Sequence, residues 1–139
     1  MRLSSKHKKL LALALLGLLL GATNYFLFQP QIYLFKAFPL LPAYYISNSF
    51  TRHFMNGYFA DICWCCALYL LTAVFTELKY LQMSGKVINL LLPFIIETLQ
   101  YFRIIPGTFD WYDLLTYGLI LVVFIKLFPL LKSTNHEKK

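Results

Sequence analysis

The sequence predicts an all-α membrane protein, a bundle of four transmembrane helices with an interfacial loop between the first two. Of the 139 residues, 59% are apolar and 14% are charged, whereas soluble domains carry about 25% charged residues. On a chain this short, so few charged side chains would leave leucine and phenylalanine in water. Long uncharged runs also alternate with short basic or proline-containing segments, which is typical of repeated membrane crossing.

Four apolar runs account for the expected helices, since about 20 apolar residues cross a bilayer. The first follows a basic start, a feature also found in cleaved signal peptides. A retained anchor is favoured because the apolar run continues to Phe28 and no Ala-x-Ala site follows Gly21. We expect a single domain, residues 1–139, with helices over about residues 10–28, 57–76, 87–102 and 112–131.

The connections between these runs carry their own signals. Residues 29–50 are apolar but contain three closely spaced prolines, which prevent a continuous helix. We expect a loop at the membrane surface there, because its tyrosine and phenylalanine rings suit the headgroup boundary. A polar turn is expected over Glu77–Lys86, and Pro106-Gly107 predicts a turn before the last helix.

The basic residues predict the orientation of the chain. With the N-terminus inside, nine Lys and Arg lie on the cytoplasmic side and three on the outer side, which is the bias that sets topology. We therefore expect a multi-pass protein of the cell membrane with both termini cytoplasmic. The net charge of +7 then reports topology, and no nucleic-acid partner is expected. The inner group is Arg2, Lys6, Lys8, Lys9, Lys79, Lys86, Lys132, Lys138 and Lys139, and the outer group is Lys36, Arg52 and Arg103.

This orientation places four of the six acidic side chains in the outer leaflet. Asp61 and Glu97 lie about 6 to 8 Å below the outer ends of their helices, and Asp110 and Asp113 begin the last helix. A charge held in lipid is costly, so such carboxylates are candidates for function. We expect a polar pocket open to the outer surface, and its ligand-binding residues are Asn56, Asp61, Glu97, Gln100, Arg103, Asp110, Asp113 and Tyr117.

The same residues also have structural interpretations. Asp110 suits the N-cap of the last helix, and Asp113 suits its first turn, near the positive end of the helix dipole. Glu97 and Gln100, three residues apart on one face, can fix packing by hydrogen bonds between helices. Asp61 can pair with a neighbouring arginine and have no further role.

No metal or cofactor is predicted. His53 is expected to be a loop residue, and the carboxylates around it lack a recognised metal-ligand spacing. Cys63, Cys65 and Cys66 lie on different faces of one apolar helix, where thiols pack as small apolar side chains.

The last part of the chain contains an ordered motif. It reads Glu97-x-x-Gln100, then Pro106-Gly107-Thr108-Phe109-Asp110-x-x-Asp113, then Tyr117-Gly118. This motif resembles the signature of the VanZ-like membrane proteins, over about residues 56–124. The resemblance implies a small four-helix protein of the bacterial cytoplasmic membrane, similar to proteins associated with resistance to teicoplanin-type glycopeptides.

Two kinds of function fit these features. The first is binding of a cell-envelope ligand, which is a glycopeptide antibiotic, a lipid headgroup or a lipid-linked wall precursor, with membrane lipids as further partners. The alternative is a membrane enzyme that acts on a lipid or lipid-linked headgroup, with one carboxylate as base and a protonated neighbour as acid. A transporter is less favoured, because no polar relay crosses the predicted membrane region.

Overall fold

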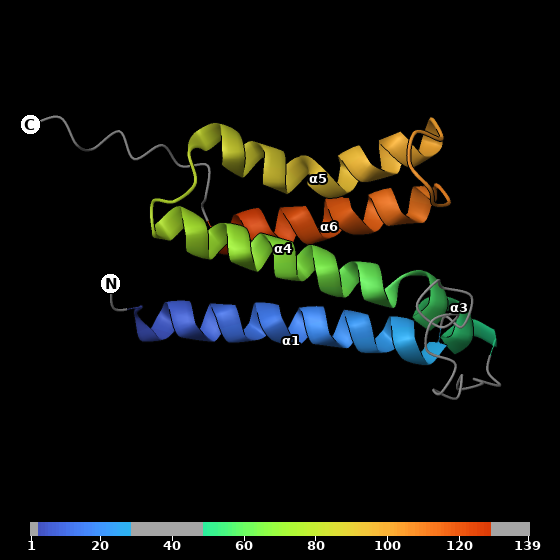
Figure 1. The fold of residues 1–139 in the computed structure, drawn as a ribbon, viewed down its shortest axis with the longest axis horizontal. Helices are drawn as coiled ribbons and strands as arrows, with labels where there is room; N and C mark the ends of the chain where they lie inside the picture. The colour runs from blue at the N-terminus through green and yellow to red at the C-terminus, as the bar shows by residue number, and fades with distance from the viewer. Residues whose placement is uncertain (1–2, 29–48, 129–139) are drawn as a thin grey trace, which may run out of the picture. The chain divides into compact units, whose positions relative to one another are not determined.

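The computed structural model describes residues 3–28 and 49–128, without the side chains of Phe26, Ser49, Arg52 and Asn56. The described residues form helices and turns and contain no strand, which confirms the predicted all-α class for this part of the chain (Figure 1). The helices are α1 (Ser5–Phe28), α3 (Ser49–Gly57), α4 (Phe59–Glu77), α5 (Met83–Tyr101) and α6 (Trp111–Leu127).

The chain divides into two compact units, Met1–Leu70 and Leu71–Lys139. The first unit contains α1, α3 and most of α4, and the second contains the end of α4 with α5 and α6. Each unit is described by itself below, and the single domain of residues 1–139 stays a prediction.

The first helix begins earlier than expected, at Ser5 instead of residue 10. The Ser4 hydroxyl oxygen accepts a hydrogen bond of 3.2 Å from the backbone N–H of His7, which is the bond of an N-cap. The lysines between this cap and the apolar run are good helix formers. The predicted start was wrong because the apolar run begins only at Leu10, whereas the helix also includes the charged residues before it.

One face of α1 carries the residues that pack in the first unit. A β-carbon added to Gly17 would lie 3.1 Å from the Cys63 carbonyl oxygen, so α1 and α4 approach closely there. The Trp64 indole covers Gly21 and stacks on Tyr25, with ring centroids 4.8 Å apart. Small residues four apart commonly allow such an approach between membrane helices. The buried residues of this face are Leu10, Ala14, Gly21 and Asn24.

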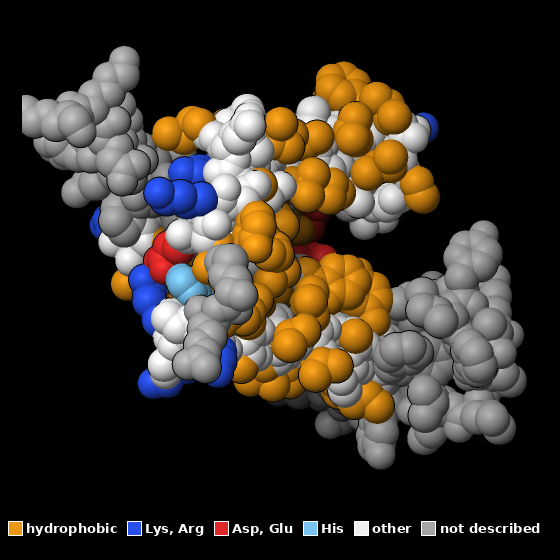
Figure 2. Space-filling model, turned by 60° about the vertical axis from the view of Figure 1, so that its left-hand side comes forward, with side chains coloured by type: hydrophobic (Ala, Val, Ile, Leu, Met, Phe, Trp, Pro, Cys, Tyr) orange, Lys and Arg blue, Asp and Glu red, His pale blue; other side chains and the backbone are white. Residues whose placement is uncertain are grey.

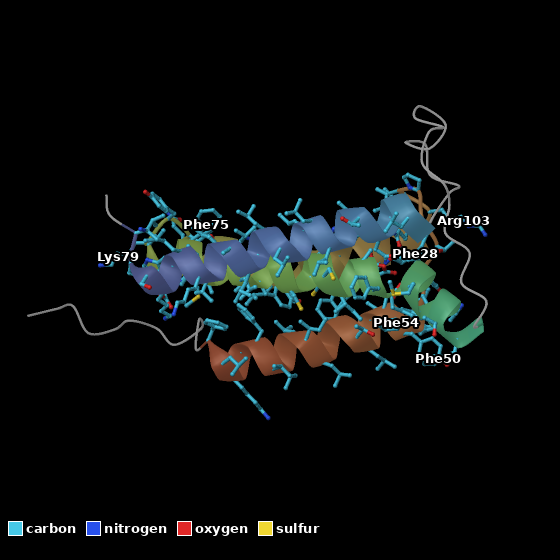
Figure 3. All side chains as sticks on the ribbon, turned by 90° about the horizontal axis from the view of Figure 1, so that it is seen from below. Phe28, Phe50, Phe54, Phe75, Lys79 and Arg103 are labelled. Atoms are coloured by element: carbon cyan, nitrogen blue, oxygen red, sulfur yellow. The ribbon has the colours of Figure 1, made fainter. Side chains whose placement is uncertain are left out.

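Helix α3, Ser49–Gly57, was not predicted. The sequence analysis placed His53 in a loop, which is wrong, because His53 lies within this helix. Phe50 and Phe54 are one helical turn apart and project from the helix (Figure 3). The predicted interfacial loop, residues 29–50, lies outside the described residues apart from its last two, which are helical.

The side chain of Asn24 holds α3 against the end of α1. Its amide nitrogen donates a hydrogen bond of 2.7 Å to the carbonyl oxygen of Met55 in α3. Asn24 is 2% exposed, and the bond itself is partly buried. A partly buried polar contact therefore joins α3 to the end of α1.

In the second unit, α4 ends in a Schellman motif. The N–H of Lys79 donates to Thr76 and the N–H of Tyr80 donates to Phe75, at 3.0 and 2.9 Å. The Phe75 and Tyr80 rings meet edge to face at 6.5 Å, which supplies the apolar contact typical of this motif. Lys79 adopts a φ of 62°, a conformation usually reserved for glycine.

The end of α5 repeats this arrangement. The N–H of Arg103 donates to Gln100 and that of Ile104 donates to Leu99, both at 2.9 Å. Arg103 has a φ of 57°. A basic residue at each of these helix ends also suits the negative end of the helix dipole.

Two predicted helix ends need correction in this unit. Helix α5 starts at Met83 instead of residue 87. The polar turn is therefore shorter than the predicted Glu77–Lys86, and Lys86 lies in α5. Helix α6 ends at Leu127 instead of residue 131, with Phe128 in an extended conformation. The residue before a proline disfavours the helical conformation, and a proline follows Phe128 in the sequence.

Helices α5 and α6 form an antiparallel hairpin in which they lie side by side (Figure 1). Phe94 and Tyr117 meet across this hairpin edge to face, with ring centroids 6.1 Å apart. The buried residues on the two helices are Leu90, Pro93 and Glu97 of α5 and Asp113, Tyr117 and Phe124 of α6.

Apolar side chains also cover much of the outside. Hydrophobic groups occupy a large part of the described surface visible in Figure 2. Two segments, Ser5–Tyr25 and His53–Glu77, are long and apolar enough to cross a membrane, judged by length and composition. Six exposed leucines lie on α1 alone, and they are Leu13, Leu15, Leu16, Leu18, Leu19 and Leu20.

Candidate functional site

Six of the eight predicted ligand-binding residues belong to the end of the α5–α6 hairpin that carries the connecting turn, and five of them, all except Arg103, lie in or directly before a helix. Two come from the last part of α5, and the others begin α6 or lie in its first two turns. They are Glu97, Gln100, Asp110, Asp113 and Tyr117.

Glu97 is the buried carboxylate of this site, with 5% of its surface exposed. It lies four residues before the end of α5, which corresponds to about 6 Å along the helix. The backbone N–H of Asp110 donates a hydrogen bond to its carboxylate. The second carboxylate oxygen, Oε2, is buried and has no hydrogen-bond partner among the described residues. Buried polar atoms nearly always have a partner, so this oxygen calls for an explanation.

Asp110 has the structural role that the sequence analysis considered for it. It is the N-cap of α6, and its Oδ1 accepts a hydrogen bond of 2.9 Å from the backbone N–H of Tyr112. In a capping box, the side chain three residues into the helix accepts from the N-cap N–H. Here Glu97 accepts that bond from the neighbouring helix. The carboxylate of α5 thus helps to begin α6.

Asp113 lies in the first turn of α6 and is 8% exposed. A carboxylate in this position is stabilised by the positive end of the helix dipole. The sequence predicted this place in the first turn, and it corresponds to a structural role for Asp113 at the helix dipole. Three acidic residues, Glu97, Asp110 and Asp113, therefore lie within one end of a single helical hairpin.

Gln100 lies against the turn that connects the two helices. A β-carbon added to Gly107 would overlap the Gln100 side-chain nitrogen and would lie 2.6 Å from its Cδ. Gly107 has a φ of +147°, a backbone conformation that residues other than glycine rarely adopt. The Pro-Gly turn therefore provides the space that Gln100 occupies. The sequence predicted the turn but not this contact.

Tyr117 is buried at 7% exposure, one turn beyond Asp113. Its ring packs against Phe94, a residue that the sequence analysis did not name. Phe94 precedes Glu97 by three residues, so the two share a face of α5. That spacing was the signal that would have identified it.

Arg103 does not point into this site. Its side chain is exposed and extends outward beyond the end of α5 (Figure 3). Its backbone closes the Schellman motif, which gives the residue a structural role at the helix end. This position does not support the predicted role of the Arg103 guanidinium in ligand binding.

Asn56 and Asp61 belong to the other unit. Asn56 is in α3, and its side chain is among those not described. Asp61 is in the first turn of α4, because this helix begins at Phe59 and not at residue 57. An acidic residue in a first turn is favoured by the helix dipole. The convergence of both residues with the α5–α6 site stays a prediction.

The remaining reactive side chains form no metal site within the described residues. No group of three His, Cys, Asp or Glu side chains is placed to bind a metal ion in that part of the chain. Cys65 is buried, Cys63 and Cys66 are partly buried, and all three are free thiols. The exposed ring of His53 lies edge to face with Tyr58, 5.7 Å away.

The arrangement is suited to accept hydrogen bonds. When ionised, the Glu97 carboxylate accepts hydrogen bonds and donates none, so a group that pairs with Oε2 in that state carries an N–H or O–H. Asp110 adds negative charge beside Glu97, which favours a cationic donor.

Comparisons of the sequence with protein-family models, with curated proteins and with solved structures found no match.

Proposed function

We propose that the chain is a VanZ-like integral membrane protein that binds a cell-envelope ligand at the turn end of its α5–α6 hairpin. In this proposal four helices, α1, α4, α5 and α6, cross the bacterial cytoplasmic membrane. Both termini are cytoplasmic, and the α5–α6 turn faces outward. The ligand is a glycopeptide antibiotic, a lipid headgroup or a lipid-linked wall precursor, and a contribution to teicoplanin-type resistance follows if the ligand is the antibiotic.

The membrane location is supported by the apolar surface and by the basic residues of the second unit. Lys79, Lys86 and Lys126 belong to the end of the α5–α6 hairpin away from its turn, whereas Arg103 alone lies at the turn. Cytoplasmic ends carry the excess of Lys and Arg in membrane proteins. Helices α5 and α6 contain 19 and 17 residues, or about 25 to 29 Å, close to the thickness of the hydrocarbon core.

The ligand-binding function rests on the Oε2 atom of Glu97. This oxygen is buried and has no partner within residues 3–28 and 49–128, while the other oxygen of the same carboxylate accepts from the N-cap N–H of α6. A purely structural carboxylate would be expected to use both oxygens. A donor group supplied from outside the protein would satisfy the second.

The orientation can be tested by cysteine labelling. Thr108 lies exposed in the α5–α6 turn, and Thr108→Cys in a chain with Cys63, Cys65 and Cys66 replaced by serine gives one reactive thiol. We expect a membrane-impermeant maleimide to label it in intact cells. Labelling only after the cells are permeabilised would refute the outward orientation.

The binding function can be tested on the purified full-length chain. Teicoplanin and a lipid-linked wall precursor are titrated against the wild type, Glu97→Gln and Glu77→Gln, and binding is measured by equilibrium methods. Glu77 is an exposed glutamate at the end of α4 and serves as the matched control. We expect Glu97→Gln to weaken binding of at least one probe by about tenfold, and Glu77→Gln to leave it unchanged. Equal binding by all three proteins would remove Glu97 from the site.

The enzymatic alternative is examined with the same materials. Incubation of the wild type with labelled lipid-linked precursor gives either unchanged precursor or a product that Glu97→Gln does not form. A product of that kind would replace binding with catalysis as the function of the site.

A further inference from the structure

We propose, as a refinement that rests on the binding function above, that Glu97 receives a primary ammonium group carried by a membrane amphiphile, such as an ethanolamine headgroup. The N–H of that ammonium donates to Oε2. The inference combines the unpartnered oxygen, the acidic residues beside it and the exposed aromatic side chains of the turn.

The unpartnered oxygen defines the chemistry of the group. Only 5% of the Glu97 surface is exposed, and the Asp110 N–H already donates to its carboxylate. The other oxygen, Oε2, has no hydrogen-bond partner in the part of the chain that the structure describes. A donor that reaches Oε2 forms its bond away from water, where charge-assisted hydrogen bonds are strongest. A primary ammonium is compact and carries three N–H groups, whereas a quaternary ammonium carries none.

Charge selects a cation over a neutral hydroxyl. Asp113 lies in the first turn of α6 and Asp110 caps it, so two further carboxylates accompany Glu97 at this end of the hairpin. The nearest basic residue in the sequence, Arg103, extends outward. A divalent metal is the other cation to consider, but the described residues form no group of three metal-binding side chains.

The amphiphilic character comes from the rim of the site. Tyr101, Phe102, Ile104, Trp111 and Tyr112 are each at least 59% exposed, and all lie at or beside the α5–α6 turn. Aromatic side chains gather at the level of lipid headgroups in membrane proteins. A ligand whose ammonium reaches Glu97 therefore has its apolar part beside an apolar rim.

The aromatic rim is ordered by its own contacts. The Phe109 ring lies 5.0 Å from that of Tyr101 and 4.9 Å from that of Trp111, both edge to face.

Aromatic faces also attract quaternary ammonium groups. If the rim were the binding element, a choline headgroup would bind as well as an ethanolamine headgroup, so the two headgroups distinguish the rim from Glu97.

The test compares phospholipids that differ only in methylation of the headgroup nitrogen. The purified full-length protein is equilibrated with equimolar phosphatidylethanolamine, its monomethyl and dimethyl derivatives, and phosphatidylcholine of the same acyl chains. Retained lipid is then measured by native mass spectrometry. We expect the wild type to retain the ethanolamine lipid about tenfold over the choline lipid, with retention falling at each methylation. Glu97→Gln should abolish this preference, and Glu77→Gln should keep it.

Four results would overturn the inference in different ways. Equal retention of the ethanolamine and choline lipids by the wild type would show that no N–H is required, and the proposed function would stand if another envelope probe still binds in a Glu97-dependent manner. An unchanged preference in Glu97→Gln would place the ammonium elsewhere. If every lipid, glycopeptide and precursor probe binds the wild type and Glu97→Gln equally, both proposals are refuted.

The methylation series needs only the wild type, so it remains decisive if Glu97→Gln does not fold. Soluble ethanolamine, added as a competitor, distinguishes a free amine from a lipid headgroup, and full competition at equal concentration would contradict the amphiphile.

Discussion

Replacing Glu97 with glutamine should leave the ligand-free protein at least as stable as the wild type. Glutamine has the shape of glutamate and keeps a carbonyl oxygen that can accept the N–H of Asp110. At the position of Oε2, which has no partner among the described residues, it places an uncharged NH2 group instead of an acidic oxygen. Neutralising an uncompensated buried charge recovers part of its desolvation penalty, so we expect the free energy of unfolding to rise by about 0 to 2 kcal/mol.

Leucine at the same position provides the matched comparison. Glu97→Leu has a similar volume but no acceptor, and it leaves the Asp110 N–H unpaired at the start of α6. An unpaired buried donor costs about 1 to 3 kcal/mol, so this variant should be less stable than Glu97→Gln by about that amount.

The assay is equilibrium unfolding of the detergent-purified proteins, without added lipid or glycopeptide. We expect the free energy of unfolding of Glu97→Gln to equal or exceed that of the wild type, and that of Glu97→Leu to be the lowest. A decrease of more than about 1 kcal/mol in Glu97→Gln, well beyond the effect of a neutral surface change, would mean that groups of the folded protein hold Oε2. The argument for an external donor would then fail.

Three further substitutions test the local geometry. Arg103→Gly should raise the free energy of unfolding by about 1 kcal/mol, because glycine adopts the left-handed conformation without the cost that arginine incurs, and Arg103→Ala, which keeps that cost, should be near neutral. Gly107→Ala should lower it by about 1 to 3 kcal/mol, since the new methyl group overlaps Gln100 and the backbone is strained; an unchanged melting temperature would argue against this turn geometry. Gly21→Leu should lower it by about 1 to 3 kcal/mol and change the fluorescence of Trp64, whose ring covers Gly21, and an unaltered spectrum would contradict the close approach of α1 and α4.

The helices were predictable from the sequence because apolar runs report them directly. Their ends were less so. Ser4 caps α1 before the lysines, and this cap was overlooked because the charges were assigned to a region outside the helix. Helix α3 was missed since the prolines upstream suggested a loop, although Phe50 and Phe54 are spaced by one helical turn.

The acidic residues of the site were predictable, but their separate roles were not. The capping role of Asp110 follows from its position before an apolar run, and the structure confirms it. The hydrogen bond from Asp110 to Glu97 depends on how α5 and α6 align across the turn, which no local pattern specifies. Arg103 was considered for its charge, whereas its left-handed backbone depends on the Schellman motif and carries no signal in a residue other than glycine.

Isotope-edited infrared spectroscopy of the Glu97 carboxyl group tests the central claim most directly. The full-length protein in lipid-depleted detergent is compared before and after addition of a total lipid extract from a bacterial cell envelope, with Glu97→Gln as the reference that lacks the signal. A new donor at Oε2 should shift the glutamate band of the wild type and leave the difference spectrum of Glu97→Gln flat. A wild-type spectrum that stays unchanged at saturating extract would show that Glu97 meets no ligand, and its carboxylate would then serve only to join α5 to α6.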